Sequence, residues 1–438
     1  MLKNKYLYFG CVLLAVASVS GCSKHKVIPE GRRVAVLEQA AQIKSEVASA
    51  AQKIELSAPT ANPYWRQTDA NAQHLIPNVK YEPQWQRQWK ADFGKGNSRH
   101  EFLISEPLVN GDFIYTIDAD GNLRAFNLAD GEIAWSVELR SEQKNVKDTA
   151  IKGVGIAMDG GNIYATTGYG AVFAVRAKDG KALWQYDTDV PLRIAPIVAA
   201  GKVLVQSIDN KFFALEVNSG EVMWQYDIAM EDTTMVGGST PAYGSSLDIA
   251  VTGFSNGELQ AFNATIGTPL WSDILISNKY AYSTTALHTI KAAPVIEGNR
   301  VYALGASNVM AAIDMRSGMR IWEKEISGSN TPLLSGNTLY VVTDKNDLVA
   351  LDKENGRILW AKSIDFGDGE KECLVFGPVM INNRIVLALA NGYVVTYDAK
   401  TGSEISRFDT DEKLNSAPIA AAGRVILVTT NAKLIVYK

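Results

Sequence analysis

A short pattern that recurs along the chain limits the fold more than any other feature of the sequence. In "DGEIAWSVEL", residues 130–139, a glycine is followed four residues later by a tryptophan. Seven glycines align in this way at spacings of 38 to 51 residues: Gly131, Gly180, Gly220, Gly267, Gly318, Gly356 and Gly402. A tryptophan follows six of them, and Ser406 takes its place in the seventh unit. Recurrence at this period indicates a repeat architecture rather than a series of unrelated domains.

Each unit predicts four short strands joined by tight turns. In the fifth unit, strands are expected over residues 293–298, 299–306 and 309–315, and residues 316–326 supply a turn and a fourth strand. A small residue, usually alanine, stands six positions before each turn glycine, and an apolar residue follows it. No helical periodicity interrupts these units. Four strands repeated every 40 to 50 residues or so are typical of the blades of a β-propeller.

The two ends of the chain are expected to complete one blade together. Seven whole units occupy roughly residues 107–410, and an eighth begins at residue 417 but stops at Lys438 after three strands. Residues 83–93, "PQWQRQWKADF", offer the missing strand, with Trp89 at the tryptophan position. Closing a ring in this way leaves no blade incomplete. We therefore predict an all-β fold over residues 85–438: an eight-bladed β-propeller of four-stranded antiparallel blades, closed by pairing the N- and C-terminal strands.

The repeated tryptophans are predicted to dock neighbouring blades against each other. A four-stranded blade cannot bury both of its apolar faces alone, and an indole buries on the order of 200 Å² while its N–H can reach a backbone carbonyl. The small residue on the adjacent strand would make room for the ring. The predicted docking residues are Trp89, Trp135, Trp184, Trp224, Trp271, Trp322 and Trp360. Stacking of these rings on a ligand is the alternative role.

The N-terminal region differs from the repeats. Residues 1–21 combine a short basic start, an apolar run and small residues at the end, the pattern of a secretory signal peptide. The next residue is Cys22, and "VSGC" resembles the lipobox of bacterial lipoproteins, in which this cysteine is acylated. With Ser23 after it, the resemblance implies a lipid anchor in the outer membrane, facing the periplasm. Residues 22–84 are predicted to form a lipidated tether, partly disordered or helical.

Composition argues against several classes of function. The formal net charge of −4 gives no electrostatic footprint for nucleic acid. The four histidines lack the spacing of metal ligands, and "DADGN" at residues 118–122 lacks the glycine and glutamate of a Ca²⁺ loop. Cys373 is the one cysteine left after signal cleavage and acylation, so an intramolecular disulfide is not expected. We predict no metal, no cofactor and no catalytic residue, and we assign no role to Cys373.

The repeat units resemble the tryptophan-docking repeats of pyrroloquinoline-quinone (PQQ) propellers. Together with the lipobox and eight blades, they make the chain resemble the BamB family of outer-membrane assembly lipoproteins. The resemblance implies a non-enzymatic scaffold subunit of the outer-membrane β-barrel assembly machinery. Such a subunit binds BamA and other Bam subunits and assists the folding and insertion of unfolded outer-membrane proteins.

The same resemblance implies where the partner would bind. The family's partner-facing loops precede the first strands of two adjacent blades. They correspond here to "EDTTMVGGSTP" and "HTIKAAP". The implied contact positions are Thr233, Met235, Val236, Gly237, Thr289 and Lys291. The leucine and arginine of the family's first loop are absent, and Thr289 and Lys291 stand where the family has acids, so the ionic part of that interface would differ.

Two other functions stay open at this point. A PQQ-dependent dehydrogenase would use the same repeats, and its family commonly has a Ca²⁺ site, a catalytic aspartate and a vicinal Cys-Cys pair. No Cys-Cys pair occurs in this sequence. A periplasmic propeller that binds a small ligand in its channel is the second alternative.

Overall fold

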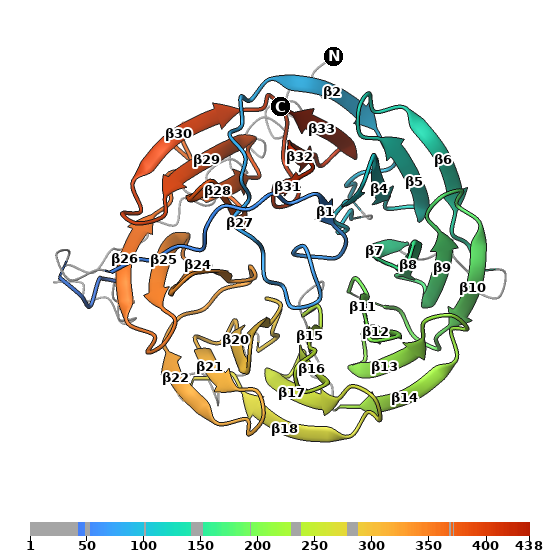
Figure 1. Ribbon diagram of the computed structural model, residues 1–438, viewed down its shortest axis with the longest axis horizontal. Helices are drawn as coiled ribbons and strands as arrows, with labels where there is room; N and C mark the ends of the chain where they lie inside the picture. Colours follow the sequence, from blue (N-terminus) through green and yellow to red (C-terminus); the bar gives the residue numbers. More distant parts are fainter. Residues whose placement is uncertain are drawn as a thin grey trace, which may run out of the picture. The chain divides into compact units, whose positions relative to one another are not determined.

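The computed structural model describes residues 43–48, 53–99, 102–141, 152–192, 194–228, 238–277, 288–367, 369–370 and 372–438. Residues 43–438 form one compact unit, and Cys22 lies outside the described residues. The unit is a ring of eight antiparallel sheets, as Figure 1 shows. None of the described residues forms a helix with the length and apolar character that crossing a membrane requires.

Each sheet is one blade, and its four strands are ordered from the channel to the circumference. In chain order, blades 1 to 4 consist of β3 (Leu108–Asn110), β4 (Phe113–Ile117), β5 (Asn122–Asn127) and β6 (Ile133–Glu138); β7 (Gly153–Asp159), β8 (Asn162–Thr167), β9 (Ala171–Arg176) and β10 (Ala182–Asp187); β11 (Ile197–Ala199), β12 (Lys202–Gln206), β13 (Lys211–Glu216) and β14 (Val222–Asp227); and β15 (Ala242–Gly244), β16 (Ile249–Gly253), β17 (Glu258–Asn263) and β18 (Pro269–Ile274). A short strand, β1 (Tyr64–Trp65), extends blade 1 on its inner edge.

The remaining blades repeat this order. Blades 5 to 7 consist of β19 (Val295–Glu297), β20 (Arg300–Leu304), β21 (Met310–Asp314) and β22 (Arg320–Lys324); β23 (Leu333–Ser335), β24 (Thr338–Val342), β25 (Asp347–Asp352) and β26 (Ile358–Ser363); and β27 (Val375–Ile381), β28 (Arg384–Leu389), β29 (Tyr393–Asp398) and β30 (Glu404–Asp409). Blade 8 combines β31 (Ile419–Ala421), β32 (Arg424–Val428) and β33 (Lys433–Tyr437) with β2 (Arg87–Asp92).

Blade 8 confirms the predicted closure of the ring. β2 pairs with β33 in antiparallel register, with Trp89 opposite Val436 and Asp92 opposite Lys433. The N-terminal strand is thus the outermost strand of a blade whose other three strands end the chain. The eight-bladed propeller predicted from the repeat spacing is confirmed, including this pairing of the two ends.

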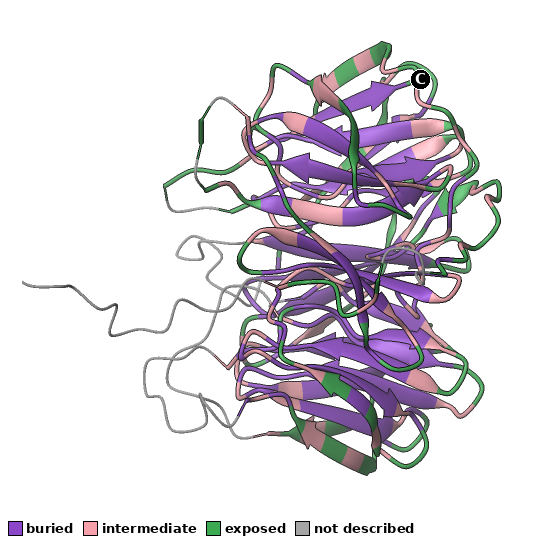
Figure 2. Cartoon of the chain, turned by 90° about the vertical axis from the view of Figure 1, so that its left-hand side faces the viewer, coloured by how far each residue is buried: buried purple, intermediate pink, exposed green. Residues whose placement is uncertain are grey.

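The strands differ in burial according to their place in the blade. The middle strands are almost continuously buried, because both of their faces pack against neighbouring blades. The outermost strands alternate between exposed and partly buried residues, as Figure 2 shows. The turns between strands one and two and between strands three and four form one edge of the ring, here called the hairpin rim. The remaining turns and the connections between blades form the opposite edge, the loop rim.

Six tryptophans bridge successive blades in the same way. Each indole N–H donates a hydrogen bond to a backbone carbonyl of the next blade at 2.8 to 3.0 Å; the pairs are Trp89 with Leu128, Trp135 with Ala177, Trp184 with Val217, Trp224 with Ala264, Trp271 with Met315, and Trp322 with Lys353. Each ring lies against the turn glycine of that next blade. A Cβ at Gly220, where φ is +74°, would lie 2.5 Å from the Trp184 ring. Glycine is therefore required both by this contact and by the backbone conformation.

The seventh tryptophan, Trp360, makes the ring contact without the hydrogen bond. Its ring lies against Gly402 of blade 7, but its buried indole N–H has no acceptor among the described residues. The carbonyl of Ala399 accepts a hydrogen bond of 2.9 Å from the Tyr340 hydroxyl. The equivalent of the acceptor used at the other contacts is thus already bonded to a different donor.

The contact between blades 7 and 8 has no repeat tryptophan, and the fold explains why. In place of a glycine turn, blade 8 has the junction of the two chain ends, where the Gln84 N–H donates to the Lys438 carbonyl at 2.9 Å. Trp85 lies at this junction, stacked on Phe408 of blade 7 at 5.1 Å between ring centroids and edge-on to Tyr437 of blade 8. Trp85 therefore fills the position that a tryptophan at residue 406 would otherwise occupy.

Candidate functional site

Residues 53–84, here called the channel segment, lie across the inner ends of the blades. Figure 1 shows this segment in blue, crossing the centre of the ring. It hydrogen-bonds to the innermost part of every blade: β1 pairs with β3, and backbone or side-chain bonds join Arg66 to Met158, Gln67 to Val198, Ala72 to Tyr243, Gln73 to Ile296, Glu55 to Asn337, Val79 to Met380 and Asn62 to Ala422. The hairpin-rim end of the channel is therefore covered by the chain's own N-terminal segment.

Residues 53–84, which belong to the region expected as a tether, bond to the inner ends of the blades. None of the described residues between 53 and 84 is helical or detached from the blades. Polar residues and prolines made the segment read as a loop, but its side chains alternate between the channel and solvent. Trp65 is 1 % exposed and Gln67 is buried, whereas Tyr64 and Arg66, each of which precedes one of them, are exposed. The residue types over positions 64–69 do not alternate in polarity, so the sequence carried no such signal for a bound extended segment.

The polar side chains that the segment directs into the channel are paired. The Gln67 side-chain amide donates to the Val198 carbonyl at 2.8 Å and accepts from the Val198 N–H at 3.0 Å. The Asn78 side chain likewise donates to the Ser57 carbonyl and accepts from the Asn383 N–H. Buried polar groups that are satisfied in this way fix one arrangement, because every alternative leaves a donor or acceptor unpaired.

Three ionisable residues meet inside the channel: Asp69 and His74 from the channel segment, and Glu106 from the approach to blade 1. The Asp69 carboxylate accepts a hydrogen bond of 2.7 Å from the Thr331 hydroxyl of blade 6 and lies 3.6 Å from His74 Nδ1. The His74 ring is 1 % exposed, and its two nitrogens face the carbonyls of Thr68 and Pro241 at 3.2 and 3.0 Å. Which of the two carbonyls accepts a hydrogen bond from a neutral imidazole depends on the tautomer of the ring.

Glu106 is the most perturbed carboxyl group of this cluster. Burial, followed by the negative charge of Asp69, raises the pKa of Glu106 to about 8. The group retains some accessible surface inside the channel, but protein surrounds it, so the charged form is poorly solvated. One carboxyl of the cluster is therefore neutral at pH 7. The Asp69 carboxylate already has a donor in the Thr331 hydroxyl, which suits a fixed structural contact better than a cation site.

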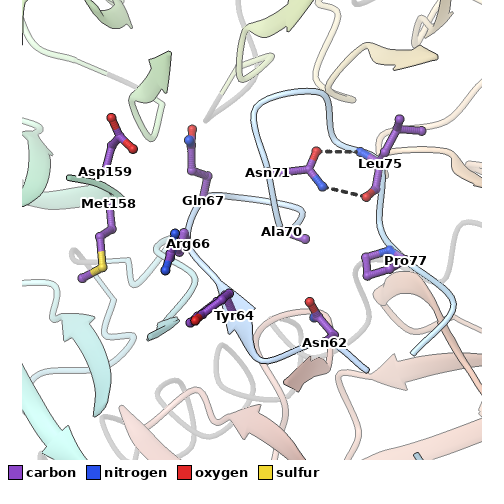
Figure 3. Close-up of a pocket in the computed structure, with 10 residues that line it drawn as sticks. All are labelled: Asn62, Tyr64, Arg66, Gln67, Ala70, Asn71, Leu75, Pro77, Met158 and Asp159. Atoms are coloured by element: carbon purple, nitrogen blue, oxygen red, sulfur yellow. Dashed lines mark hydrogen bonds between the residues drawn. The ribbon is translucent and has the colours of Figure 1, made fainter. Parts of the chain in front are cut away.

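A shallow pocket of about 340 Å³ lies on the outer side of the channel segment. Figure 3 shows its lining, which comes from the channel segment and the end of β7, with Tyr64, Arg66, Asn71, Met158 and Asp159 around it. The Arg66 guanidinium lies 3.9 Å from the Tyr64 ring centre and donates to Asn110. The Asn71 side chain is bonded within its own turn to Leu75. The Asn71 side chain and Arg66 Nε thus already have partners within the protein.

The predicted partner-binding residues divide into three groups in the structure. Thr233, Met235, Val236 and Gly237 lie outside the described residues. Thr289 is 3 % exposed, and its hydroxyl donates to the Ser255 carbonyl of a loop-rim turn of blade 4. Lys291 is exposed on the loop rim, where its charge partly offsets the rise that desolvation causes in the pKa of Asp344. Of the two residues in this loop, Lys291 is therefore the one available to a partner.

The described residues do not fit the PQQ and calcium centre of a quinoprotein. Within the described ranges, no three or more His, Cys, Asp or Glu side chains are grouped so that they could hold a metal ion. Cys373 is the only cysteine in these ranges and is not in a disulfide, so no vicinal disulfide can form there. Burial raises the pKa of its thiol, which disfavours the reactive thiolate.

The fold and the channel define the class of protein: a closed eight-bladed propeller of PQQ-like repeats, with its own N-terminal segment across one end of the channel. A family model described as "Outer membrane protein assembly factor BamB" matches residues 30–152 and 143–362. The chain belongs to this family. A second model, for the β-propeller domain of glucose, ethanol and alcohol dehydrogenases, matches residues 323–415.

Curated relatives agree with the family assignment. The chain is 26 % identical over 358 residues to outer membrane protein assembly factor BamB of Shigella dysenteriae, covering 80 % of this chain and 88 % of the relative. It is 25 % identical over 358 residues to the Escherichia coli protein of that name, with the same coverage. The Burkholderia pseudomallei protein is 27 % identical over 347 residues, covering 79 % of this chain and 85 % of the relative.

Solved structures share the fold at lower identity. The crystal structure of BamB from Moraxella catarrhalis superposes with a TM-score of 0.66 at 20 % identity, covering 80 % of this chain and all of that one. Quinohemoprotein alcohol dehydrogenase from Comamonas testosteroni has the same TM-score at 12 % identity, covering 86 % of this chain and 80 % of that one. At these identities both likenesses concern the fold, which scaffolds and enzymes share.

Proposed function

We propose that this protein is a non-enzymatic scaffold subunit of the outer-membrane β-barrel assembly machinery. It binds BamA and other Bam subunits and assists the folding and insertion of unfolded outer-membrane proteins. The match of the BamB family model over most of the chain is the observation that carries the proposal. The poor fit of the described residues to a quinone or metal centre supports a binding role over a catalytic one.

The covered channel favours the outer surfaces of the ring as the sites of partner binding. Residues 53–84 bond to all eight blades at the hairpin-rim end of the channel, so a ligand entering there would have to displace them. A rigid ring presents its rim loops at fixed positions, and interfaces of this kind depend on a few anchors. We place the BamA contact on the loop rim before blades 4 and 5, with residues 233–237 before blade 4 and Lys291 before blade 5 as its described charged position.

Anchoring through Cys22 would hold this ring at the outer membrane, on the periplasmic side. Acyl chains contribute about 0.8 kcal/mol per buried methylene, so several chains anchor a protein stably. A Cys22→Ser variant tests this part separately. It should leave the outer-membrane fraction while keeping the same melting temperature, and its retention there at high salt would contradict the anchor.

A photo-crosslinking amino acid at position 291 tests the partner site in intact cells. We expect a covalent adduct with BamA, identified by mass spectrometry of the captured band. The same amino acid at Met223, on the circumference of blade 3, is the matched control and should give no such adduct. A second variant, Met235→Glu with Val236→Glu and Lys291→Glu, should lose BamA capture without a change in melting temperature. If this variant captured BamA normally and the protein bound PQQ or oxidised an alcohol, the scaffold function would be wrong and a quinoprotein dehydrogenase would be the better proposal.

A further inference from the structure

The outermost strands of the ring share a local irregularity that leaves an apolar side chain in solvent. In every blade the pairing of the outer strand shifts by one residue just before the tryptophan position, a β-bulge. In five blades the extra residue is a large apolar one that is 41 to 48 % exposed: Leu183, Met223, Leu270, Ile321 and Ile405. In blade 6 the equivalent residue, Leu359, is only 5 % exposed.

Blade 6 differs because residues 43–48 lie along the edge of its outer strand. Figure 1 shows this short blue segment outside β26. The Glu46 N–H donates to the Ile358 carbonyl at 2.9 Å, and the Ser45 hydroxyl donates to the Leu359 carbonyl at 2.6 Å. Ile43 and Val47 pack against the apolar clusters on either side of the blade. The bulge of blade 6 is thus a docking site for an extended segment, and the chain itself occupies it.

An acidic side chain completes the recognition at blade 6. The Glu46 carboxylate accepts the Ile358 N–H at 3.0 Å and pairs with the Lys324 ammonium at 2.8 Å. These contacts lower the pKa of Glu46, against an opposing effect of desolvation. Lys324 belongs to the preceding blade and stands two residues after its docking tryptophan. The site therefore combines an apolar bulge residue with a lysine from the neighbouring blade.

One other blade has the same combination. The position equivalent to Lys324 is two residues after the docking tryptophan of the blade before. For blade 7 this residue is Lys362, and for blades 1 to 5 it is Ala91, Val137, Tyr186, Tyr226 and Asp273. The Lys362 stem lies against the turn glycine of blade 7, Gly402. Lys362 is exposed and makes no ion pair or side-chain hydrogen bond with the described part of the chain. Ile405, the bulge residue of blade 7, is 48 % exposed.

The charge next to the blade 7 bulge is already neutralised. Glu404 occupies the position of Ile358, and its carboxylate accepts hydrogen bonds from the Arg407 guanidinium at 3.2 and 3.0 Å. An incoming carboxylate would therefore meet the unpaired Lys362 rather than an unpaired acid. β30 is the terminal strand of its sheet, so its outer edge has backbone groups free to pair.

We propose that the edge of β30 binds an extended segment of another polypeptide, as the edge of β26 binds residues 43–48. The recognised segment has a glutamate or aspartate flanked by apolar residues. Its backbone pairs at the bulge, its apolar side chain covers Ile405, and its carboxylate pairs with Lys362. This surface lies on the circumference, away from the loop rim, and does not depend on the proposed BamA contact.

A peptide with the sequence of residues 43–48, IKSEVA, tests the proposal when it carries a photo-reactive group at its N-terminus. Full-length protein is irradiated with the peptide, and labelled positions are mapped by mass spectrometry. We expect labelling of β30 and of the turn that precedes it. Lys362→Glu and Ile405→Asp should each reduce labelling about tenfold, which corresponds to about 1.4 kcal/mol. Both side chains are exposed, so melting temperatures should stay unchanged.

Charge exchange separates recognition from non-specific labelling. A matched peptide with lysine in place of glutamate, IKSKVA, should label wild-type β30 poorly and the Lys362→Glu protein well. A Glu46→Lys protein, whose blade 6 edge is released, should also be labelled on β26 by IKSEVA, and this establishes that the peptide binds in trans. Labelling of β26 there without labelling of β30 would overturn the proposal. Labelling of neither strand would also overturn it, because the contacts of residues 43–48 would then be insufficient between molecules.

Discussion

At the scale of single residues, the blade contacts separate the packing of an indole from its hydrogen bond. Trp322 has both, because its N–H donates to the Lys353 carbonyl at 2.8 Å. Trp360 has the same ring contact, but its buried N–H has no partner among the described residues. An unpaired buried donor costs free energy rather than contributing it. The two positions therefore form a natural pair for measuring the hydrogen bond alone.

We expect Trp322→Phe to lower the free energy of unfolding by about 1 kcal/mol more than Trp360→Phe. Both substitutions remove a similar ring volume, so their packing costs largely cancel in the comparison. Only the first breaks a hydrogen bond, and it leaves the Lys353 carbonyl unpaired. Urea denaturation followed by fluorescence measures the difference. Equal losses at the two positions would contradict the role assigned to the indole N–H.

Glu106 predicts how the stability of the ring depends on pH. Its pKa is about 8 in the folded protein, against about 4.3 for an ordinary glutamate. Between these two values the folded state binds more protons than the unfolded state, so stability falls as pH rises through this range. Glu106→Gln keeps the neutral form at every pH. The variant should unfold at a melting temperature a few degrees above that of the wild type at pH 8.5 and close to it at pH 5.

Two neighbours make this comparison specific. Asp69 and His74 face the same part of the channel. Both residues are unchanged in Glu106→Gln, so the difference between the two proteins reports on Glu106. If the difference in melting temperature between the two proteins were the same at every pH from 5 to 8.5, Glu106 would already be ionised in the folded protein.

At the scale of the element, the sequence predicted the strands that repeat in every blade but not the features that occur once. The four strands of each blade follow from the recurring glycine, alanine and tryptophan, because every blade solves the same packing problem. The closing strand followed from counting, since the last unit lacked one strand and residues 83–93 could supply it. Trp85 was not predicted, because its packing on Phe408 and Tyr437 belongs to the chain junction, where the repeat is broken.

The channel segment has no counterpart in the repeat, and its composition concealed it. Pro, Asn, Ser and Thr residues normally indicate a loop, and the composition of this segment predicts one. Only its contacts with the blades show that it is a bound extended segment. Several of its buried polar groups bond to backbone atoms of the blades, such as Gln67 to Val198 and His74 to Pro241. Those partners are more than 100 residues away in the sequence. Pattern analysis along the chain cannot supply such contacts.

Truncation at two points distinguishes the channel segment from the closing strand. A chain that starts at Pro83 keeps β2 and loses the burial of Trp65, Ile76 and Val79. We expect it to remain a folded propeller whose free energy of unfolding is lower by on the order of 5 kcal/mol. A chain that starts at Gly94 also loses β2 and should show no cooperative transition. Circular dichroism during heating measures both, and an unchanged melting temperature for the first chain would mean that the channel segment adds no stability.

At the scale of the whole molecule, the ring is held closed by one non-covalent strand pairing. Apart from β1 with β3, all other neighbouring strands of the blades are consecutive in the chain, whereas β2 and β33 belong to its opposite ends. Trp85 strengthens this junction because it contacts both blade 7 and β33. Sub-global opening of the ring should therefore begin in blade 8, since β2 is the one outer strand that no hairpin joins to the rest of its blade.

Hydrogen exchange under native conditions tests where the ring opens. Trp85→Ala should raise amide exchange in β2 and β33 by about 100-fold or more, since a Trp→Ala change of about 3 to 5 kcal/mol acts on that opening step. Blades 2 to 5 should keep their protection, because they remain packed and covalently joined on both sides. Trp271→Ala is the control: it should reduce protection in blades 4 and 5 and leave β2 unchanged. If Trp85→Ala instead raised exchange equally in every blade, the ring would open as a single cooperative unit and blade 8 would not be its weakest point.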